Sequence, residues 1–316
     1  MALCIPGSQA WQSWGCVNAV SVCGVFCIFG GVKMKVGLVL EGGAMRGMYT
    51  AGILDIMLDE GIQADGVIGV SAGVLFGVNY LSKQRGRSIR YNKRFNGDKR
   101  YMGIHSLLTT GNIVNTDFAY YKVPYELDVF DDETFKKSGI PFYAVVTNMQ
   151  TGKPEYIQIH SVFEQMEVLR ASASMPLVSK PVYLDGVPYL DGGIADSIPY
   201  EKMMELGYDR IIVVLTRDFS YRKKPSSKLP TELRYHKYPE FCQTLEHRYE
   251  SYNASVAHLR WLEKQGKVFV IRPSSPIGIK RIEKDADKLQ EVYDLGLQDG
   301  RHSIPALQEY LHPCTA

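Results

Sequence analysis

The stretch that decides the fold reads DGVIGVSAGVLFGVNYL and covers residues 65–81. Its first part, 65–70, is a short apolar run rich in β-branched residues, which predicts a buried strand. After Ser71 the apolar residues recur at helical spacing, so a helix is predicted to begin at residue 72. Ser71 is therefore expected on a tight turn between a strand and a helix, with its hydroxyl exposed.

Gly69 and Gly73 flank Ser71 in a G-x-S-x-G pattern. Glycine has no Cβ, so these two positions remove side chains that would crowd the turn. The helix that follows directs its N-terminal N–H groups and its positive dipole end at the serine, where negative charge develops during attack on an ester. The pattern predicts that Ser71 is a nucleophile.

A second glycine-rich segment, EGGAMRG at residues 41–47, follows a predicted strand at 36–40. A dinucleotide-binding loop would need a third-position glycine and an acidic residue after the next strand, and a phosphate loop would need lysine where Met48 stands. The segment is better suited to a helix start whose backbone N–H groups bind an oxyanion. Arg46 is open to two interpretations, a positive charge at this site or a partner for a surface carboxylate.

Further along, Asp191 precedes the glycine pair Gly192 and Gly193. Residues 182–190 predict a hairpin that turns at Asp185-Gly186, and Asp191-Gly192 is open to interpretation as another such turn. Alternatively, the second glycine and a loop leading to a helix at residue 200 would leave Asp191 at a strand end, free to point into a cleft. Nucleophile, base and oxyanion hole are the three parts that acyl transfer needs.

Taken in order, G-G-x-x-R-G from Gly42, G-V-S-A-G from Gly69 and D-G-G from Asp191 resemble the motifs of the patatin-like phospholipase family, bacterial type. The similarity includes ASASMP at residues 171–176 and extends over 35–215. It implies an α/β fold, a three-layer α/β/α sandwich with a mostly parallel central sheet. It also implies a lipid acyl hydrolase of phospholipase A or lysophospholipase type, a serine hydrolase that acts on carboxylic esters.

Carried over by position, the resemblance implies that Ser71 is the nucleophile and Asp191 the general base of a Ser-Asp dyad that forms an acyl-enzyme. It implies no metal and no cofactor. Ala44 stands where a third glycine is common and is expected to take ordinary φ and ψ angles. The oxyanion hole would be formed by the backbone amides of Gly42, Gly43 and Ala44. The supporting residues would be Arg46, Gly47, Gly69, Gly73, Gly192 and Gly193.

An ordinary aspartate has a pKa of about 3.9 and is a poor base towards a hydroxyl, so Asp191 must be buried and close to Ser71 to act. Seven histidines leave a Ser-Asp-His triad open; His160 is the best candidate, and His302 or His312 would serve a general α/β-hydrolase esterase. A catalytically silent lipid-binding or regulatory protein on the same scaffold is the alternative of another class.

Composition is that of an ordinary globular chain, with 316 residues, 45% hydrophobic and 22% charged. Strand and helix patterns alternate, which favours one hydrolase domain over 34–316 with C-terminal helices. Residues 1–33 are expected to be a poorly ordered extension, either preceding a native start at Met34 or acting as a weak membrane anchor. Further strands are predicted at 142–147, 155–159, 210–215 and 268–271, and helices at 47–60, 162–173, 200–206, 240–264 and 282–299.

The net charge of +2 lacks the excess of basic residues typical of a nucleic-acid-binding protein. The scarcity of cysteine after residue 27 is typical of a protein in a reducing cytoplasm. The expected partner is a phospholipid or another lipid ester. Two basic stretches, from Lys83 to Arg100 and from Arg222 to Lys228, suit peripheral contact with the inner face of a membrane, or are solvated faces. Tyrosines at 120, 121 and 125 either line an acyl pocket or pack under a lid.

Overall fold

A computed structural model describes residues 34–312, and within them eight strands form one sheet in the order β5-β6-β3-β2-β1-β7-β8, with β4 on the free side of β3. The expectations for residues 1–33 lie outside the described residues. The strands are β1 (Val36–Leu40), β2 (Gly66–Val70), β3 (Phe142–Asn148), β4 (Pro154–Ile159), β5 (Val182–Leu184), β6 (Val187–Asp191), β7 (Arg210–Val214) and β8 (Val268–Ile271). Pairing is parallel from β3 through β2, β1 and β7 to β8, and antiparallel where β3 meets β4 and β6 and where β5 meets β6.

The central strands are apolar on both faces because helices cover both sides of the sheet. In β1, Leu38 and Leu40 join one hydrophobic cluster while Val39 joins the cluster on the opposite face. Alternate residues of β7 divide in the same way. A parallel strand that is buried on both faces has a nearly continuous apolar sequence, which is why these strands could be predicted from short apolar runs.

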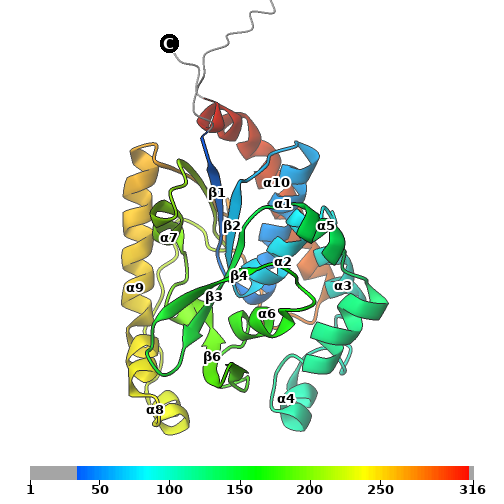
Figure 1. Ribbon diagram of the computed structural model, residues 1–316, viewed down its shortest axis with the longest axis vertical. Helices are drawn as coiled ribbons and strands as arrows, with labels where there is room; N and C mark the ends of the chain where they lie inside the picture. The colour runs from blue at the N-terminus through cyan, green and yellow to red at the C-terminus, as the bar shows by residue number, and fades with distance from the viewer. Residues whose placement is uncertain (1–33, 313–316) are drawn as a thin grey trace, which may run out of the picture. The chain divides into compact units, whose positions relative to one another are not determined.

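Two groups of helices make the outer layers (Figure 1). The first group packs around α1 and α2, and the second consists of α7 and α9. This arrangement confirms the predicted α/β/α sandwich with a mostly parallel sheet. The helices of the first face include α1 (Gly47–Asp59), α2 (Ala72–Leu81), α3 (Arg87–Phe95) and α10 (Ala286–Leu311); those of the second are α7 (Tyr200–Glu205) and α9 (Pro239–Lys264).

Shorter elements complete the described chain. Those that the sequence did not predict include the helical segments between residues 87 and 137. A π-helix, η2, stands among them and is wound more widely than an α-helix. The remaining elements are η1 (Ala44–Arg46), α4 (Ile104–Thr110), η2 (Asp117–Leu127), α5 (Asp132–Lys137), α6 (Met166–Ser172), η3 (Gly192–Ile194) and α8 (Leu229–Tyr235). No helix in this part of the chain combines the length and apolarity needed to cross a bilayer.

Two predicted helices have wrong boundaries. The last helix was expected over 282–299, but α10 begins later and continues through Pro305 to Leu311. Its C-terminal turns persist because Leu307 and Leu311 are buried in the core. The helix expected over 162–173 begins only at Met166, since 162–165 form turns.

Helix α10 lies directly against α1, and two glycines permit this approach. A Cβ on Gly296 would lie 2.2 Å from the carbonyl oxygen of Tyr49, and one on Gly52 would lie 2.4 Å from that of Tyr293. Both distances are shorter than any normal contact, so neither position accepts a larger residue without moving a backbone. The C-terminal helix is thereby fixed to the layer that carries the start of α2.

Candidate active site

Ser71 lies at the sharp turn between β2 and α2. Its backbone has φ +55° and ψ −119°, a strained conformation for a residue with a side chain. The Ser71 N–H donates to Ser172 Oγ at 3.0 Å, and the Ser172 hydroxyl donates to the Val145 carbonyl at 2.7 Å. Ser172 therefore ties the strained turn to β3.

The glycines around Ser71 serve close packing, as expected from their lack of a Cβ. A Cβ on Gly73 would lie 2.4 Å from the carbonyl oxygen of Leu40, and one on Gly69 would lie 2.8 Å from the backbone of Gly73 and Val74. Gly47 meets the start of α2 similarly, since a Cβ there would lie 2.7 Å from the Phe76 ring. These glycines let the loop after β1 and the turn at Ser71 pack against each other.

Asp191 ends β6 and lies opposite Val146 of β3 in the antiparallel register. The Ser71 hydroxyl donates to Asp191 Oδ2 at 2.7 Å, and the Gly193 N–H donates to Oδ1 at 2.8 Å. β5 and β6 form the predicted hairpin, and of the two interpretations of Asp191 the structure shows the strand end. A Cβ on Gly192 would lie 2.1 Å from the Val145 carbonyl oxygen, so this glycine lets the chain turn tightly beneath the carboxylate.

The Asp191 carboxyl is almost completely buried, with 7% of the residue exposed. Burial raises its pKa, while Arg248 and the hydrogen bond from Ser71 act in the opposite direction. Arg248 Nε donates to the Gly193 carbonyl, which holds the guanidinium beside the loop that carries Asp191. A carboxylate with a raised pKa is a better proton acceptor than a free aspartate, and a buried one is shielded from water.

The loop after β1 passes Ser71 on the other side. A Cβ on Gly42 would lie 3.0 Å from Ser71 Cβ, and one on Gly43 would lie 2.7 Å from Thr216 Oγ1. Within the described residues, no acceptor takes the backbone N–H of Gly42, Gly43 or Ala44. These amides are free to donate to a bound oxyanion.

The expectation that Ala44 takes ordinary backbone angles is wrong. Its φ is +48°, in the left-handed region that favours glycine. An alanine there costs on the order of 1 kcal/mol, and the surrounding contacts hold it in place. One of these anchors is Glu41, which is 3% exposed and accepts from the Thr216 N–H at 2.6 Å and the Tyr252 hydroxyl at 2.8 Å.

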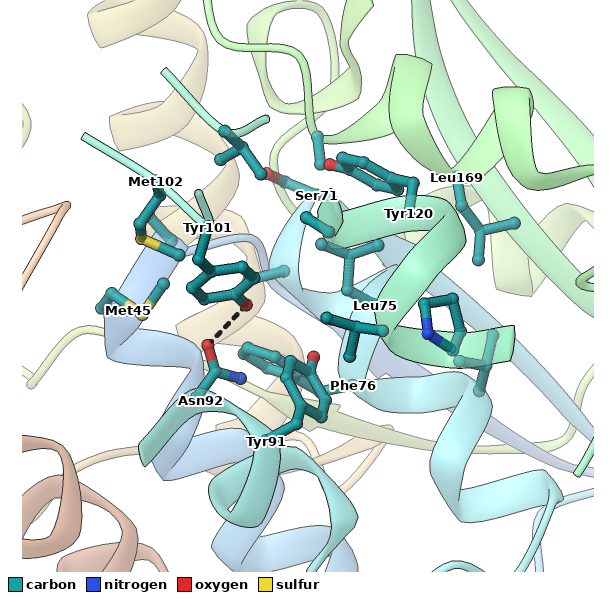
Figure 2. Close-up of a pocket in the computed structure, with 18 of the residues that line it drawn as sticks. Met45, Ser71, Leu75, Phe76, Tyr91, Asn92, Tyr101, Met102, Tyr120 and Leu169 are labelled. Atoms are coloured by element: carbon teal, nitrogen blue, oxygen red, sulfur yellow. Dashed lines mark hydrogen bonds between the residues drawn. The ribbon is translucent and has the colours of Figure 1, made fainter. Parts of the chain in front are cut away.

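Two pockets meet at Ser71. The first has an empty volume of about 960 Å³ and is lined mainly by apolar side chains, many of them from α2, η2 and α6. Helix α3 contributes Tyr91 and the polar side chains of Arg87 and Asn92. Figure 2 shows Leu75, Phe76 and Tyr120 around this space, with Ser71 at one end of it. In the same view the Tyr101 hydroxyl donates to Asn92 Oδ1 at 3.0 Å.

Of the three tyrosines of η2 that the sequence singled out, one lies where an acyl pocket was expected. Tyr120 lines the apolar pocket. Tyr121 donates to Glu167 at 2.7 Å, and Tyr125 stacks on Phe163 with ring centroids 4.1 Å apart. These two side chains are exposed and do not line the pocket.

The second pocket is polar and has an empty volume of about 700 Å³. Arg46 lies here, and no carboxylate in the described chain pairs with it, so the structure places its charge at the site. Burial, and after it the charge of Arg217, lowers the pKa of Arg46 to about 10. No histidine lines either pocket among the residues that the structure describes.

Sequence reasoning missed two residues that contact the segments carrying Ser71 and Asp191, namely Ser172 and Arg248. Ser172 was part of a recognised motif, but nothing in the motif indicated its hydrogen bond to the turn. Arg248 lies on α9, far from every motif, and only the fold brings it to Asp191. Neither residue belongs to a local spacing pattern that could have identified its contact.

Fold and site together define an α/β protein in which a buried serine and aspartate meet at a strand–helix turn beside an apolar pocket. The family model described as patatin-like phospholipase matches residues 38–204, more than half of the chain. The chain therefore belongs to the patatin-like phospholipase family. A second model, described as a domain of unknown function (DUF6363), matches residues 238–312.

Among similar proteins, the uncharacterized protein YjjU of Escherichia coli is 24% identical over 88% of this chain and 79% of its own length. Lysophospholipase nte1 of Aspergillus fumigatus is 30% identical over 57% of this chain, but the match spans only 12% of that protein. Among solved structures, VipD of Legionella pneumophila aligns with a TM-score of 0.37 at 12% identity, covering 86% of this chain and 67% of that one. The family match and the lysophospholipase relative agree with a lipid hydrolase.

The segment matched by the domain of unknown function is part of the site. Arg248, Tyr252 and Arg281 all lie within 238–312, and all three line the polar pocket together with Ser71 and Asp191. The C-terminal region therefore completes one wall of the cavity that the patatin-like region opens.

Proposed function

We propose that this protein hydrolyses the carboxylic ester of a lipid, in the manner of a phospholipase A or lysophospholipase, with Ser71 as nucleophile and Asp191 as general base. The observation that carries the proposal is the 2.7 Å hydrogen bond from Ser71 Oγ to Asp191 Oδ2 at the mouth of the apolar pocket. Family membership and the fungal lysophospholipases support a lipid ester as substrate.

In the proposed reaction, Asp191 accepts the Ser71 proton as Oγ attacks the ester carbonyl carbon. Negative charge moves to the carbonyl oxygen, where the amides of Gly42, Gly43 and Ala44 stabilise it. The intermediate collapses, the alcohol leaves with the proton that Asp191 held, and the acyl group stays on Ser71. Asp191 then takes a proton from water, whose oxygen attacks the acyl carbon. As the bond between the acyl carbon and Ser71 Oγ breaks, Asp191 returns that proton to Oγ, and the fatty acid is released.

The apolar pocket is the proposed acyl site. Ser71 lies at one end of it, so a carbonyl placed at Oγ would extend its hydrocarbon chain between Leu75, Phe76 and Tyr120. Transfer of each methylene group from water into such surroundings is worth about 0.8 kcal/mol. That energy favours a long acyl chain.

We further propose that residues 34–316 act as one hydrolase domain, because the C-terminal segment lines the same pocket as the patatin-like region.

Membrane contact through the stretch from Lys83 to Arg100 is poorly supported, since three of its arginines form ion pairs within the molecule with Asp59 or Asp128. The loop from Arg222 to Lys228 carries exposed cations and is the better candidate. A cytoplasmic location, at the inner face of the membrane, remains part of the proposal.

The test is release of fatty acid from mixed phospholipid and lysophospholipid vesicles, together with labelling by a fluorophosphonate probe. Ser71→Ala is expected to abolish both. Ser303→Ala, in which a hydroxyl bonded to its own helix is removed from α10, is the matched control and should behave as the wild type. Hydrolysis that survives Ser71→Ala would overturn the proposal. Absence of both hydrolysis and labelling in the wild type would favour the catalytically silent binding protein.

A further inference from the structure

The polar pocket beside Ser71 carries an excess of positive charge. Two acidic residues line it, and Arg46 enters it from the loop after β1. Four more cations come from segments that no motif marks: Arg217 and Lys223 after β7, Arg248 on α9, and Arg281 before α10.

Neither acidic residue neutralises these cations by pairing with them. Glu41 accepts from Thr216 and Tyr252, and Asp191 accepts from Ser71 and Gly193. Within the described chain, the side chains of Arg46, Arg217, Lys223 and Arg281 form no ion pair with a carboxylate.

The cations destabilise one another's charge. Burial, followed by the charges of Arg248 and other arginines, lowers the pKa of Lys223 to about 7. Arg248 likewise has its pKa lowered by burial, although Asp191 partly offsets this. A bound anion would reverse these shifts, because it favours the charged form of every cation around it.

Each of the two tyrosine rings that line the pocket already has a cation over it. The Arg217 guanidinium carbon lies 4.0 Å from the centre of the Tyr221 ring, and Lys223 Nζ lies 4.4 Å from the centre of the Tyr252 ring. A quaternary ammonium group is usually held by such faces or by a free carboxylate. Here a choline headgroup would find neither and would meet like charges.

The cavity outside the polar pocket is also lined by positive charge. A wider outer cavity, with an empty volume of about 1360 Å³, shares Tyr221, Lys223, Arg248 and Arg281 with the polar pocket. Its lining adds Arg222 and Lys224 and, among the described residues, no acidic side chain. A cleft with one sign of charge raises the local concentration of ligands of the opposite sign.

We propose that the polar pocket is the headgroup site and that it selects lipid esters whose headgroup is a phosphate without an amine, the chemistry of a lysophosphatidate. The inference rests on the proposed ester hydrolysis at Ser71. Ala44, Met175 and Arg281 line both pockets, as Ser71 does, so an ester at Ser71 has its acyl chain on one side and its phosphate on the other. Guanidinium groups match phosphate oxygens in a bidentate geometry.

The first experiment compares kcat/KM for 1-oleoyl lysophosphatidate, 1-oleoyl lysophosphatidylcholine and 1-oleoylglycerol in identical detergent micelles. The lysophosphatidate is expected to exceed the choline lipid by about tenfold or more, since its phosphate monoester carries more negative charge than the choline phosphodiester and brings no ammonium group among the cations. Equal or faster hydrolysis of the choline lipid would overturn the inference.

Variants locate the effect. Arg217→Gln should lower the ratio of kcat/KM for lysophosphatidate to that for 1-oleoylglycerol by about tenfold, because it removes one charged donor. Arg301→Gln makes the same change of net charge on an exposed position of α10 outside the pocket, and should leave the ratio unaltered. An equal loss in both variants would mean that overall charge, and not this pocket, sets the preference.

Calorimetric titration of the Ser71→Ala protein with glycerol 3-phosphate and inorganic phosphate separates the two proposals. Binding that Arg217→Gln weakens, with no ester hydrolysed by the wild type, would retain the anion pocket and reject the hydrolase. Hydrolysis without discrimination among the three lipids would retain the hydrolase and reject the polar pocket as a headgroup site. Inorganic phosphate should also inhibit lysophosphatidate hydrolysis competitively; binding without competition would show that the pocket serves a free anion and is not the headgroup site.

Discussion

The two pockets that meet at Ser71 differ in how the chain builds them. The apolar pocket is lined mainly by α2, α3, η2 and α6, which all lie inside the region matched by the patatin-like family model. The polar pocket takes Arg248 and Arg281 from the C-terminal segment and Arg217 and Lys223 from the connection between the two matched regions. The part that would hold the acyl chain thus lies mainly in the family-matched region, whereas four of the five cations of the polar pocket lie outside it, the exception being Arg46.

This difference has a chemical consequence. Every lipid ester has a hydrocarbon chain, so a family of lipid hydrolases needs the apolar pocket whatever its headgroup. Cations outside the motifs can change without disturbing the turn at Ser71, and they would change the headgroup that fits. Specificity in this chain is therefore expected to follow residues 217–281 more than the motifs.

Asp191→Asn is expected to have the largest effect, because the proposed base serves every ester substrate, whichever of the two pockets binds it. The amide cannot accept the Ser71 proton, so kcat should fall by about a thousandfold for charged and uncharged esters alike, in the range found for loss of a general base. The measurement is kcat on lysophosphatidate and on 1-oleoylglycerol. Asp294→Asn, an exposed change on α10, is the control. Loss confined to one substrate would contradict a shared base.

Asp191→Asn is expected to raise the stability of the folded protein, although it lowers activity. Burial raises the pKa of Asp191 in the folded protein, so the ionised carboxylate is disfavoured there and stability falls as pH rises through that pKa. Activity rises over the same interval because the base must be ionised. Asp191→Asn should therefore be more stable than the wild type above this pKa and equal to it at acid pH, as measured by denaturant unfolding across pH. If Asp191→Asn were less stable than the wild type at every pH, the raised pKa of Asp191 would be contradicted.

Ser172→Ala is expected to come next in size. It leaves the Ser71 N–H and the Val145 carbonyl without their partner, at a cost of about 1–3 kcal/mol in stability. Because the turn positions the nucleophile, kcat should fall by about tenfold or more, with KM nearly unchanged. Ser172→Thr keeps the hydroxyl and should restore much of kcat. Equal kcat for Ser172→Ala and the wild type would show that the turn at Ser71 keeps its conformation without the hydrogen bonds of Ser172.

The strand–turn–helix at Ser71 could be predicted because each of its signals is local: a β-branched run, two glycines and a helical period within 17 residues. Asp191 required more, since the hairpin was recognisable but only the sheet register shows that its end faces Ser71. Ala44 was predicted wrongly because intrinsic preference gave ordinary angles, whereas the contacts of the folded loop impose a left-handed one.

The polar pocket was beyond sequence reasoning for a related reason. Its cations come from four separate parts of the chain, and nothing in the spacing of Arg217, Arg248 and Arg281 indicates that they meet. The sequence instead drew attention to the dense basic stretch from Lys83, where Arg87 proves to be buried and paired with Asp128. Local charge density indicates composition, whereas a binding site depends on tertiary proximity.

Leu75→Trp tests the apolar side alone. Leu75 lies one turn into α2 and lines the pocket near Ser71, so a larger ring there should shorten the space for the acyl chain. We expect the ratio of kcat/KM for a 16-carbon to a 4-carbon p-nitrophenyl ester to fall by about tenfold, the loss of two methylene contacts. Ile104→Trp, at an exposed position of α4, is the control. An unchanged ratio would place the acyl chain elsewhere.

Ala44→Gly is expected to have the smallest effect, and it tests the boundary between the pockets. Glycine relieves the left-handed strain at φ +48° but gains freedom in the unfolded chain, so the free energy of unfolding should rise by no more than about 1 kcal/mol. Since Ala44 lines both pockets and its side chain carries no charge, kcat/KM should change by the same factor for lysophosphatidate and 1-oleoylglycerol. A change confined to the lysophosphatidate would mean that the methyl group itself shapes the headgroup side. In that case the loop after β1, and not only residues 217–281, contributes to headgroup selection.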